Sequence, residues 1–225
     1  MNRLVGPESG AVIFDMDGVI VHTNPFHAIA FAEFFRKHKV DFKEEDFVEH
    51  MYGKHNSYIM SHFFGRPING SELKALEDEK EALFREIYKD KVEAVWGFEG
   101  FLKALKGAGF STGVATSAPW ANLELVTGKL DIAGQMGSML ASEDVLKHKP
   151  DPEIYLKSAK RLDVNPSHCV VFEDSFSGVT AAKRAGTRVV GVLSSHGVDE
   201  LPPCDHYIRD YREINVEIVR ELITG

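Results

Sequence analysis

The stretch AVIFDMDG, residues 11–18, decides how the rest of the chain is interpreted. Four apolar residues are typical of a buried strand, and two aspartates, Asp15 and Asp17, follow at the point where that strand ends. In open α/β proteins, ligands bind at the carboxyl ends of the strands. Side chains two residues apart in an extended segment point to the same side, so we expect both carboxylates to face one small volume.

Predicted strands and helices alternate from residue 93 to the C-terminus. Apolar runs typical of strands are interleaved with helical patterns, the last of which covers residues 211–223; the runs are FSTGVATS, QMGSMLAS, HCVVFEDS, RVVGVL and HYIRD. This alternation implies right-handed crossovers between parallel strands. The sequence therefore predicts an α/β fold with a Rossmann-like three-layer α/β/α core, in which helices cover both faces of a parallel sheet.

Residues 22–92 have a different character. They carry helical patterns over residues 26–39 and 71–90 and no convincing strand. We therefore expect a small all-helical domain, residues 22–92, inserted after the first strand of a core formed by residues 1–21 and 93–225. An insertion beside the carboxyl end of that strand would act as a lid or cap over the site. The alternative is a structural addition that never moves.

The composition excludes several classes of protein. The 225-residue chain is 44% hydrophobic and carries a net charge of −8, which argues against a nucleic-acid partner. No apolar run approaches the ~20 residues of a membrane span, so no membrane partner is expected. The two cysteines, Cys169 and Cys204, do not suggest a disulfide framework. These features predict a cytoplasmic protein, for which a monomer is the simplest expectation.

Further polar residues follow the predicted strands. Thr116 and Ser117 come after TGVA, and Glu173 and Asp174 after CVVF, while Lys149 lies in KHKPDP just before a helix. Because the carboxyl ends of parallel strands share one edge of a sheet, we expect these groups to converge with Asp15 and Asp17. Thr116, Ser117 and Asp174 could also cap the helices that follow them.

Charge counting indicates a cation in this cleft. Four carboxylates would meet there, and each like-charge pair at a separation of 4 Å costs about 4 kcal/mol at an effective dielectric constant near 20. Lys149 supplies one positive charge. The rest fits a hard divalent cation, and Mg²⁺ is commonly bound by one or two carboxylates together with a substrate phosphate.

The ordered set of motifs resembles the haloacid dehalogenase superfamily of phosphotransferases. The set is DMDGV, a hydroxyl pair after a strand, the lysine of KPDP, and FEDS followed by a glycine, and together these motifs span essentially the whole chain. The helical insertion resembles the small cap of the β-phosphoglucomutase-like branch. The second aspartate argues for phosphoryl transfer rather than dehalogenation, because the dehalogenases proper lack it.

The resemblance implies a role for each residue. Asp15 would be the nucleophile that takes the phosphoryl group, and Asp17 the general acid and base. Thr116 and the amide of Ser117 would hold phosphoryl oxygens, and Lys149 would neutralise the phosphate and Asp15. Mg²⁺ would be bound by Asp15, by the backbone carbonyl of Asp17 and by Asp174. Glu173 would be a further ligand or a partner of one.

The substrate is expected to depend on the cap. The family's cap loop matches residues 50–57, where Asn56 stands in place of the mutase's phosphate-binding arginine, with Lys54 and His55 beside it. Lys80 matches a second phosphate-binding lysine, and Trp120 replaces a small polar residue. The departures favour a phosphatase for a small phosphorylated metabolite over a β-phosphoglucomutase. The third alternative is a catalytically silent binding protein on the same fold.

Overall fold

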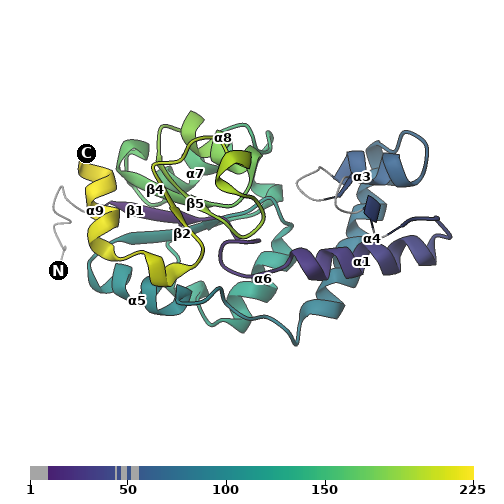
Figure 1. Ribbon diagram of the computed structural model, residues 1–225, viewed down its shortest axis with the longest axis horizontal. Helices are drawn as coiled ribbons and strands as arrows, with labels where there is room; N and C mark the ends of the chain where they lie inside the picture. The colour runs from purple at the N-terminus through teal and green to yellow at the C-terminus, as the bar shows by residue number, and fades with distance from the viewer. Residues whose placement is uncertain (1–9, 44, 47–49, 52–55) are drawn as a thin grey trace. The chain divides into compact units, whose positions relative to one another are not determined.

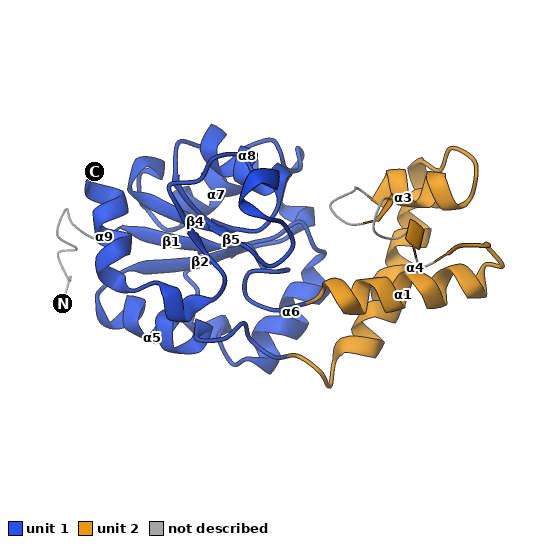
Figure 2. Ribbon diagram, viewed as in Figure 1, with its two compact units in different colours: residues 1–22, 93–225 blue, residues 23–92 orange. Residues whose placement is uncertain are grey.

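The computed structural model describes residues 10–43, 45–46, 50–51 and 56–225. The chain forms two compact units, one of residues 1–22 with 93–225 and one of residues 23–92 (Figure 2). The division expected from the sequence placed the first boundary one residue earlier. His22 therefore belongs to the first unit and not, as predicted, to the helical one. The two units are described separately below.

The first unit contains a six-stranded parallel sheet with the strand order β3-β2-β1-β4-β5-β6. Its strands are β1 Ala11–Phe14, β2 Ser111–Ala115, β3 Ser138–Leu140, β4 Cys169–Glu173, β5 Arg188–Val192 and β6 His206–Ile208. In the centre, Phe14 is paired with Val114 of β2 and with Phe172 of β4. The carboxyl ends of β1, β2 and β4 are therefore level, and the residues that follow them start from one edge.

Helices cover both faces of this sheet (Figure 1). The helix α5 (Phe98–Gly107) packs on β2 and α9 (Val216–Thr224) packs on β4, and these two helices contact each other. On the other face, α7 (Glu153–Arg161) packs on β1, β2 and β3, while α8 (Phe176–Arg184) packs on β4 and β5. A further helix, α6 (Trp120–Lys129), follows β2. The predicted three-layer α/β/α core is confirmed.

The two faces of the sheet bury different side chains. Alternate residues of a strand point to opposite faces. On the α5–α9 face, Phe14 packs edge-on against Phe98 at 5.2 Å between ring centroids, within an aromatic cluster that also contains Phe101, Phe172 and Tyr211. On the other face, Ile13 belongs to a mostly aliphatic cluster. This apolar core holds β1 rigidly, and hence the residues that follow it.

The described residues of the second unit form helices and connecting turns only. Its helices include α1 (Asn24–Lys37), α3 (Asn56–Phe63) and α4 (Gly70–Tyr88), and α4 contacts both α1 and α3. Phenylalanines dominate its core, which includes Phe31, Phe34 and Phe35. The predicted all-helical insertion is confirmed for the residues that the structure describes.

The end of the chain differs from its prediction. A single helix was expected over residues 211–223, but a 3₁₀ turn covers Tyr211–Glu213 and α9 begins only at Val216. The cause is Asn215, whose side chain accepts a hydrogen bond from the N–H of Ile218 at 3.0 Å and so caps the new helix. In the described part of the chain, no helix has the length and apolar character needed to cross a bilayer.

Candidate active site

Asp15, the first residue after β1, is buried at the carboxyl edge of the sheet. The N–H of Asp15 still donates to the carbonyl of Phe172 at 2.9 Å, so its position follows the sheet. The chain then turns through Gly18, whose φ of +76° favours glycine. A Cβ atom added there would lie 2.6 Å from Cγ of Asp174 and 2.8 Å from Oγ of Ser194. Glycine thus lets the ends of β1, β4 and β5 meet.

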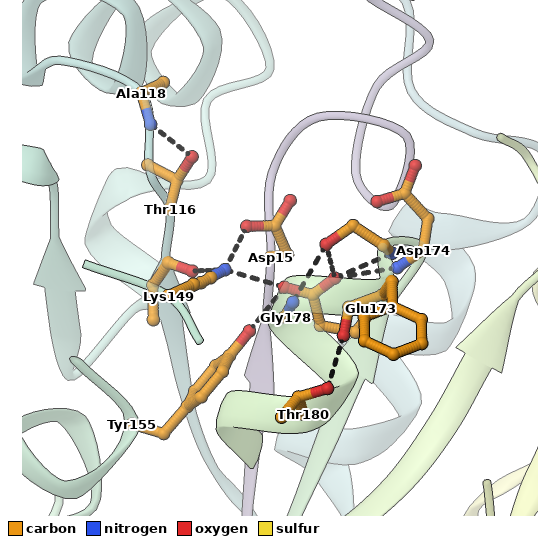
Figure 3. Close-up of polar contacts among 12 residues, drawn as sticks. Asp15, Thr116, Ala118, Lys149, Tyr155, Glu173, Asp174, Gly178 and Thr180 are labelled. Carbon is orange, nitrogen blue, oxygen red and sulfur yellow. Dashed lines mark hydrogen bonds and ion pairs between the residues drawn. The ribbon is translucent and has the colours of Figure 1, made fainter. Parts of the chain in front are cut away.

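Lys149 links three strand ends (Figure 3). Its Nζ donates to Oδ1 of Asp15 at 2.6 Å, to Oε1 of Glu173 at 2.7 Å and to the carbonyl of Ala115 at 3.1 Å. All three of its protons therefore have acceptors. Burial alone would lower the pKa of Lys149, but Asp15 and Glu173 raise that pKa well above its usual value. The ammonium group consequently remains charged at neutral pH.

Glu173 holds Lys149 in place. Its Oε1 also accepts from the Tyr155 hydroxyl at 2.8 Å, and its Oε2 accepts from the N–H of Asp174, the N–H of Ser175 and Oγ of Ser175, each at 3.0 Å. Burial acts to raise the pKa of Glu173, but Lys149 and the other donors lower it overall. Both oxygens are fully used by protein donors. The structure therefore gives no support to Glu173 as a metal ligand and makes it the partner of Lys149.

The start of α8 is shaped around this carboxylate. The hydroxyl of Ser175 accepts from the N–H of Gly178 at 3.0 Å, which caps the helix. A Cβ atom at Gly178 would overlap the carboxylate of Glu173. The glycine of the FEDS-G motif is therefore required so that Glu173 can lie against the first turn of α8.

Asp174 is buried, and its two oxygens differ in their environments. Its Oδ2 accepts from Oγ of Ser194 at 3.2 Å and from the hydroxyl of Ser195 at closer range. Among the described residues, none donates to Oδ1. Burial is the main cause that raises the pKa of Asp174 to about 7, and the charges of Glu173 and Asp17 add to it. The protein itself therefore compensates the negative charge of Asp174 poorly.

The pKa of Asp15 is raised for the same reasons. Its pKa is raised well above the usual value by burial; Lys149 opposes this, and Glu173, Asp174 and Asp17 reinforce it. Asp17, which is half-buried, thus acts on the pKa of both Asp15 and Asp174. The four carboxylates therefore lie close enough to act on one another's pKa, and Lys149 bonds two of them, Asp15 and Glu173.

This donor set fits a hard divalent cation. Neither Oδ2 of Asp15 nor Oδ1 of Asp174 accepts a hydrogen bond from any residue in the described part of the chain. Within the same residues, no group of three or more His, Cys, Asp or Glu side chains could hold a metal ion by itself. Mg²⁺ does not require such a group, because it keeps several waters and takes one or two carboxylates with a substrate phosphate.

Thr116 and Ser117 lead from β2 into α6. The N–H of Thr116 donates to the carbonyl of Leu140 at 3.0 Å, and its Oγ1 accepts from the N–H of Ala118 at 3.0 Å. No residue in the described ranges accepts the hydroxyl proton of Thr116, which can therefore donate to a ligand. Ser117 is exposed. Beyond them, the N–H of Trp120 donates to the carboxylate of Glu143 at 3.0 Å, so a negative group already occupies the start of α6.

The candidate substrate residues of the helical unit are engaged with their own neighbours. Lys80 is buried, forms an ion pair with Glu81 and approaches Nδ1 of His27 at 3.1 Å. Asn56, at the start of α3, hydrogen-bonds the Glu77 carboxylate. Lys54 and His55 lie outside the described residues.

Four residues of this network were not singled out from the sequence: Tyr155, Ser194, Ser195 and Glu143. The two serines follow RVVGVL at the same sheet edge as the other motifs, so their position was a usable signal. Tyr155 and Glu143 lie inside a helix and a 3₁₀ turn, where nothing in the local pattern marks them.

Comparisons with known proteins show which family and which relatives the chain resembles. The family model described as haloacid dehalogenase-like hydrolase matches residues 12–192. A phosphorylated carbohydrates phosphatase of Thermotoga maritima is 34% identical over 196 residues, which covers 82% of this chain and 86% of that protein. A β-phosphoglucomutase of Bacillus subtilis is 29% identical over 222 residues, with 94% of each chain covered.

A solved structure is similar over nearly the whole chain. It is a hydrolase of the same superfamily, family IA variant 3, from Entamoeba histolytica. The two chains are 29% identical, with a TM-score of 0.89, and the match covers 96% of this chain and 100% of that one.

Proposed function

This chain belongs to the haloacid dehalogenase-like hydrolases, and on that premise we propose that it is a Mg²⁺-dependent phosphatase of a small phosphorylated metabolite such as a sugar phosphate. Its relatives include both phosphatases and a phosphomutase. The observation that carries the proposal is the buried set formed by Asp15, Lys149 and Glu173, with Asp17 beside it. It combines a nucleophile, a fixed positive charge and a candidate acid in one place.

The proposed reaction has two steps. The Asp15 carboxylate, which Lys149 holds through Oδ1, attacks phosphorus with one of its oxygens. As the bond between this carboxylate oxygen and phosphorus forms, the bond to the leaving oxygen breaks, and Asp17 gives the leaving oxygen a proton. Water then attacks the phosphorus, loses a proton to Asp17 and releases phosphate from Asp15. Thr116 holds a phosphoryl oxygen throughout, and the positive charge of Lys149 stabilises the phosphoryl group.

Mg²⁺ would be held by Asp15, Asp174 and the backbone carbonyl of Asp17, where it would neutralise the negative charge of the phosphoryl group. In this arrangement the protein contributes mainly positioning and charge compensation. Glu173 contributes indirectly, because it fixes Lys149.

Hydrolysis is favoured over a mutase reaction because residues at positions compared with the mutase are already engaged with neighbours in their own unit. Glu143 places a carboxylate on the N–H of Trp120, which would repel another anion. Lys80 is paired with Glu81, and Asn56 offers an amide bonded to Glu77 in place of a guanidinium. An amide cannot provide the bidentate, permanent charge of an arginine.

The experiment is a phosphate-release screen with p-nitrophenyl phosphate and a panel of sugar phosphates, with and without a chelator. We expect release that needs Mg²⁺ and is lost in Asp15→Asn. The same samples are assayed for conversion of β-glucose 1-phosphate to glucose 6-phosphate. Efficient conversion would establish the phosphomutase alternative, and full activity of Asp15→Asn would contradict both.

A further inference from the structure

The loop after β5 converges on Asp174. Ser194 and Ser195 both donate to Oδ2 of its carboxylate, and Nδ1 of His196 lies 3.0 Å from its backbone carbonyl oxygen. Three consecutive residues of one loop thus contact a single aspartate. Asp174 is only 6% exposed, so these contacts replace much of the water that an exposed carboxylate would have.

The carboxylate is closed on one side only. Oδ2 accepts two hydroxyl protons, and it is also the atom nearest to where a Cβ of Gly18 would lie, so the turn after β1 covers this oxygen as well. No described residue donates to Oδ1. The structure therefore distinguishes the two oxygens of one carboxylate and leaves a single oxygen for a ligand.

We propose that Ser194 and Ser195 are positioning residues that make Asp174 a one-oxygen ligand and thereby favour Mg²⁺ over Ca²⁺. The inference rests on the proposed function, because it concerns the same cation. Mg²⁺ needs near-ideal octahedral geometry with short bonds, whereas the larger Ca²⁺ readily takes both oxygens of a carboxylate. Holding Oδ2 with two hydroxyls blocks the two-oxygen mode.

Hydroxyl groups suit this role better than charged donors. A lysine or arginine at either position would fix the carboxylate, but it would also cancel the negative charge that attracts the cation. A serine donates a hydrogen bond and adds no net charge. Residues that orient metal ligands in this way typically change metal affinity about 10- to 100-fold when they are replaced.

The test is calorimetric binding of Mg²⁺ and of Ca²⁺ to the full-length protein, without substrate. For Ser194→Ala/Ser195→Ala we expect the Mg²⁺ dissociation constant to rise about tenfold or more, while that of Ca²⁺ changes less. Ser195→Thr keeps the hydroxyl and should retain most of the affinity. If the double variant does not fold, the two single alanine variants are compared in the same way.

Two controls separate the possible failures. Asp174→Asn should remove most of the binding, and Ser167→Ala should not change it, because the Ser167 hydroxyl bonds Asn165 at the start of β4, the opposite end of the strand. If the wild-type protein binds no Mg²⁺, the proposed function fails. If the wild-type protein binds and Asp174→Asn does not, equal affinities of the double variant and the wild type, or equal losses for both cations, would overturn the inference alone.

Discussion

Each of the two units buries one lysine among its described residues, and the two lysines differ in what they hold. Lys149 bonds groups 134, 34 and 24 residues away in the sequence, which come from the ends of β1, β2 and β4. Lys80 pairs with the adjacent Glu81 and with His27 of α1. Both ammonium groups also face an aromatic ring, at 4.9 Å from Tyr155 and 4.5 Å from Phe31.

The difference leads us to expect a catalytic role for Lys149 and a structural role for Lys80. Lys149 shares its charge between two carboxylates of the candidate site, so its removal changes the electrostatics where phosphate would bind. Lys80 neutralises a carboxylate of its own helix and ties α4 to α1. We therefore expect replacement of Lys149 to affect turnover and stability together, and replacement of Lys80 to affect stability alone.

We expect the largest effect from the substitution Lys149→Met. Removing one partner of a buried ion pair costs about 3–5 kcal/mol of unfolding free energy, because the other charge is left uncompensated. Two carboxylates lose their partner here, and the phosphoryl group loses its fixed cation. We expect kcat/KM for p-nitrophenyl phosphate to fall at least about 10³-fold. Urea unfolding measures the loss of stability, and steady-state kinetics measure the loss of turnover. Near-normal turnover would contradict the catalytic role expected for Lys149.

Glu173→Gln is expected to rank second. The carboxylate accepts five hydrogen bonds, and an amide nitrogen in place of either oxygen would meet N–H or O–H donors instead. Buried donors without acceptors cost about 1–3 kcal/mol each. We expect lower stability in urea and a fall in kcat of about 10- to 100-fold, as for other residues that position a functional group. A variant as stable as the wild type would contradict this role.

Lys80→Met tests the other side of the comparison. Glu81 would be buried without its cation, so we expect a loss of about 3 kcal/mol in unfolding free energy. Turnover of p-nitrophenyl phosphate should fall less than about tenfold, because Lys80 is engaged with Glu81 and His27 of its own unit. The matched control is Lys80→Met with Glu81→Gln, which removes both charges and should recover part of the stability. A loss of turnover as large as that of Lys149→Met would contradict the difference in role expected between Lys80 and Lys149.

Glu153→Gln should have the smallest effect. Glu153 accepts from the N–H groups of Leu146 and Lys147, at 3.2 and 2.9 Å, and so anchors the loop that leads to Lys149. Lys157, followed by these two N–H groups, lowers the pKa of Glu153 from 4.5 to about 2. The pKa is lower in the folded state, so the stabilisation is present above about pH 4.5 and is lost as the pH falls towards 2.

The measurement for Glu153 is the difference in thermal midpoint between the variant and the wild type over that pH range. We expect the wild type to be the more stable protein at pH 7 and the difference to shrink on acidification. A difference that stays constant from pH 7 to the lowest pH at which both proteins fold would contradict this origin of the stabilisation.

The sequence predicted the location of the site better than its internal connections. Asp15, Thr116 and Asp174 follow apolar runs that are typical of buried strands, and the topology of a parallel sheet brings such residues to one edge. The partners of Glu173 could not be predicted, because they depend on Tyr155 and Lys149, which reach it only after α7 has packed on the sheet.

The helical unit was less predictable for a related reason. Lys80 has the residue type and position of a phosphate ligand, and only the folded structure shows that Glu81 and His27 engage it. The start of α9 was misplaced because Ile214 and Val216 continue the apolar pattern across a non-helical turn. The start of α9 is set by a specific polar contact of Asn215, whereas the role of Lys80 as a substrate residue stays a prediction.

The central claim is that Asp15 accepts the phosphoryl group, and trapping it during turnover is the most direct test. The protein is mixed with Mg²⁺ and p-nitrophenyl phosphate, quenched in acid and reduced with borohydride, which converts an aspartyl phosphate to homoserine. We expect homoserine at position 15 in the wild-type peptide and none without substrate. Turnover that leaves Asp15 unmodified, or modification of another aspartate instead, would contradict it.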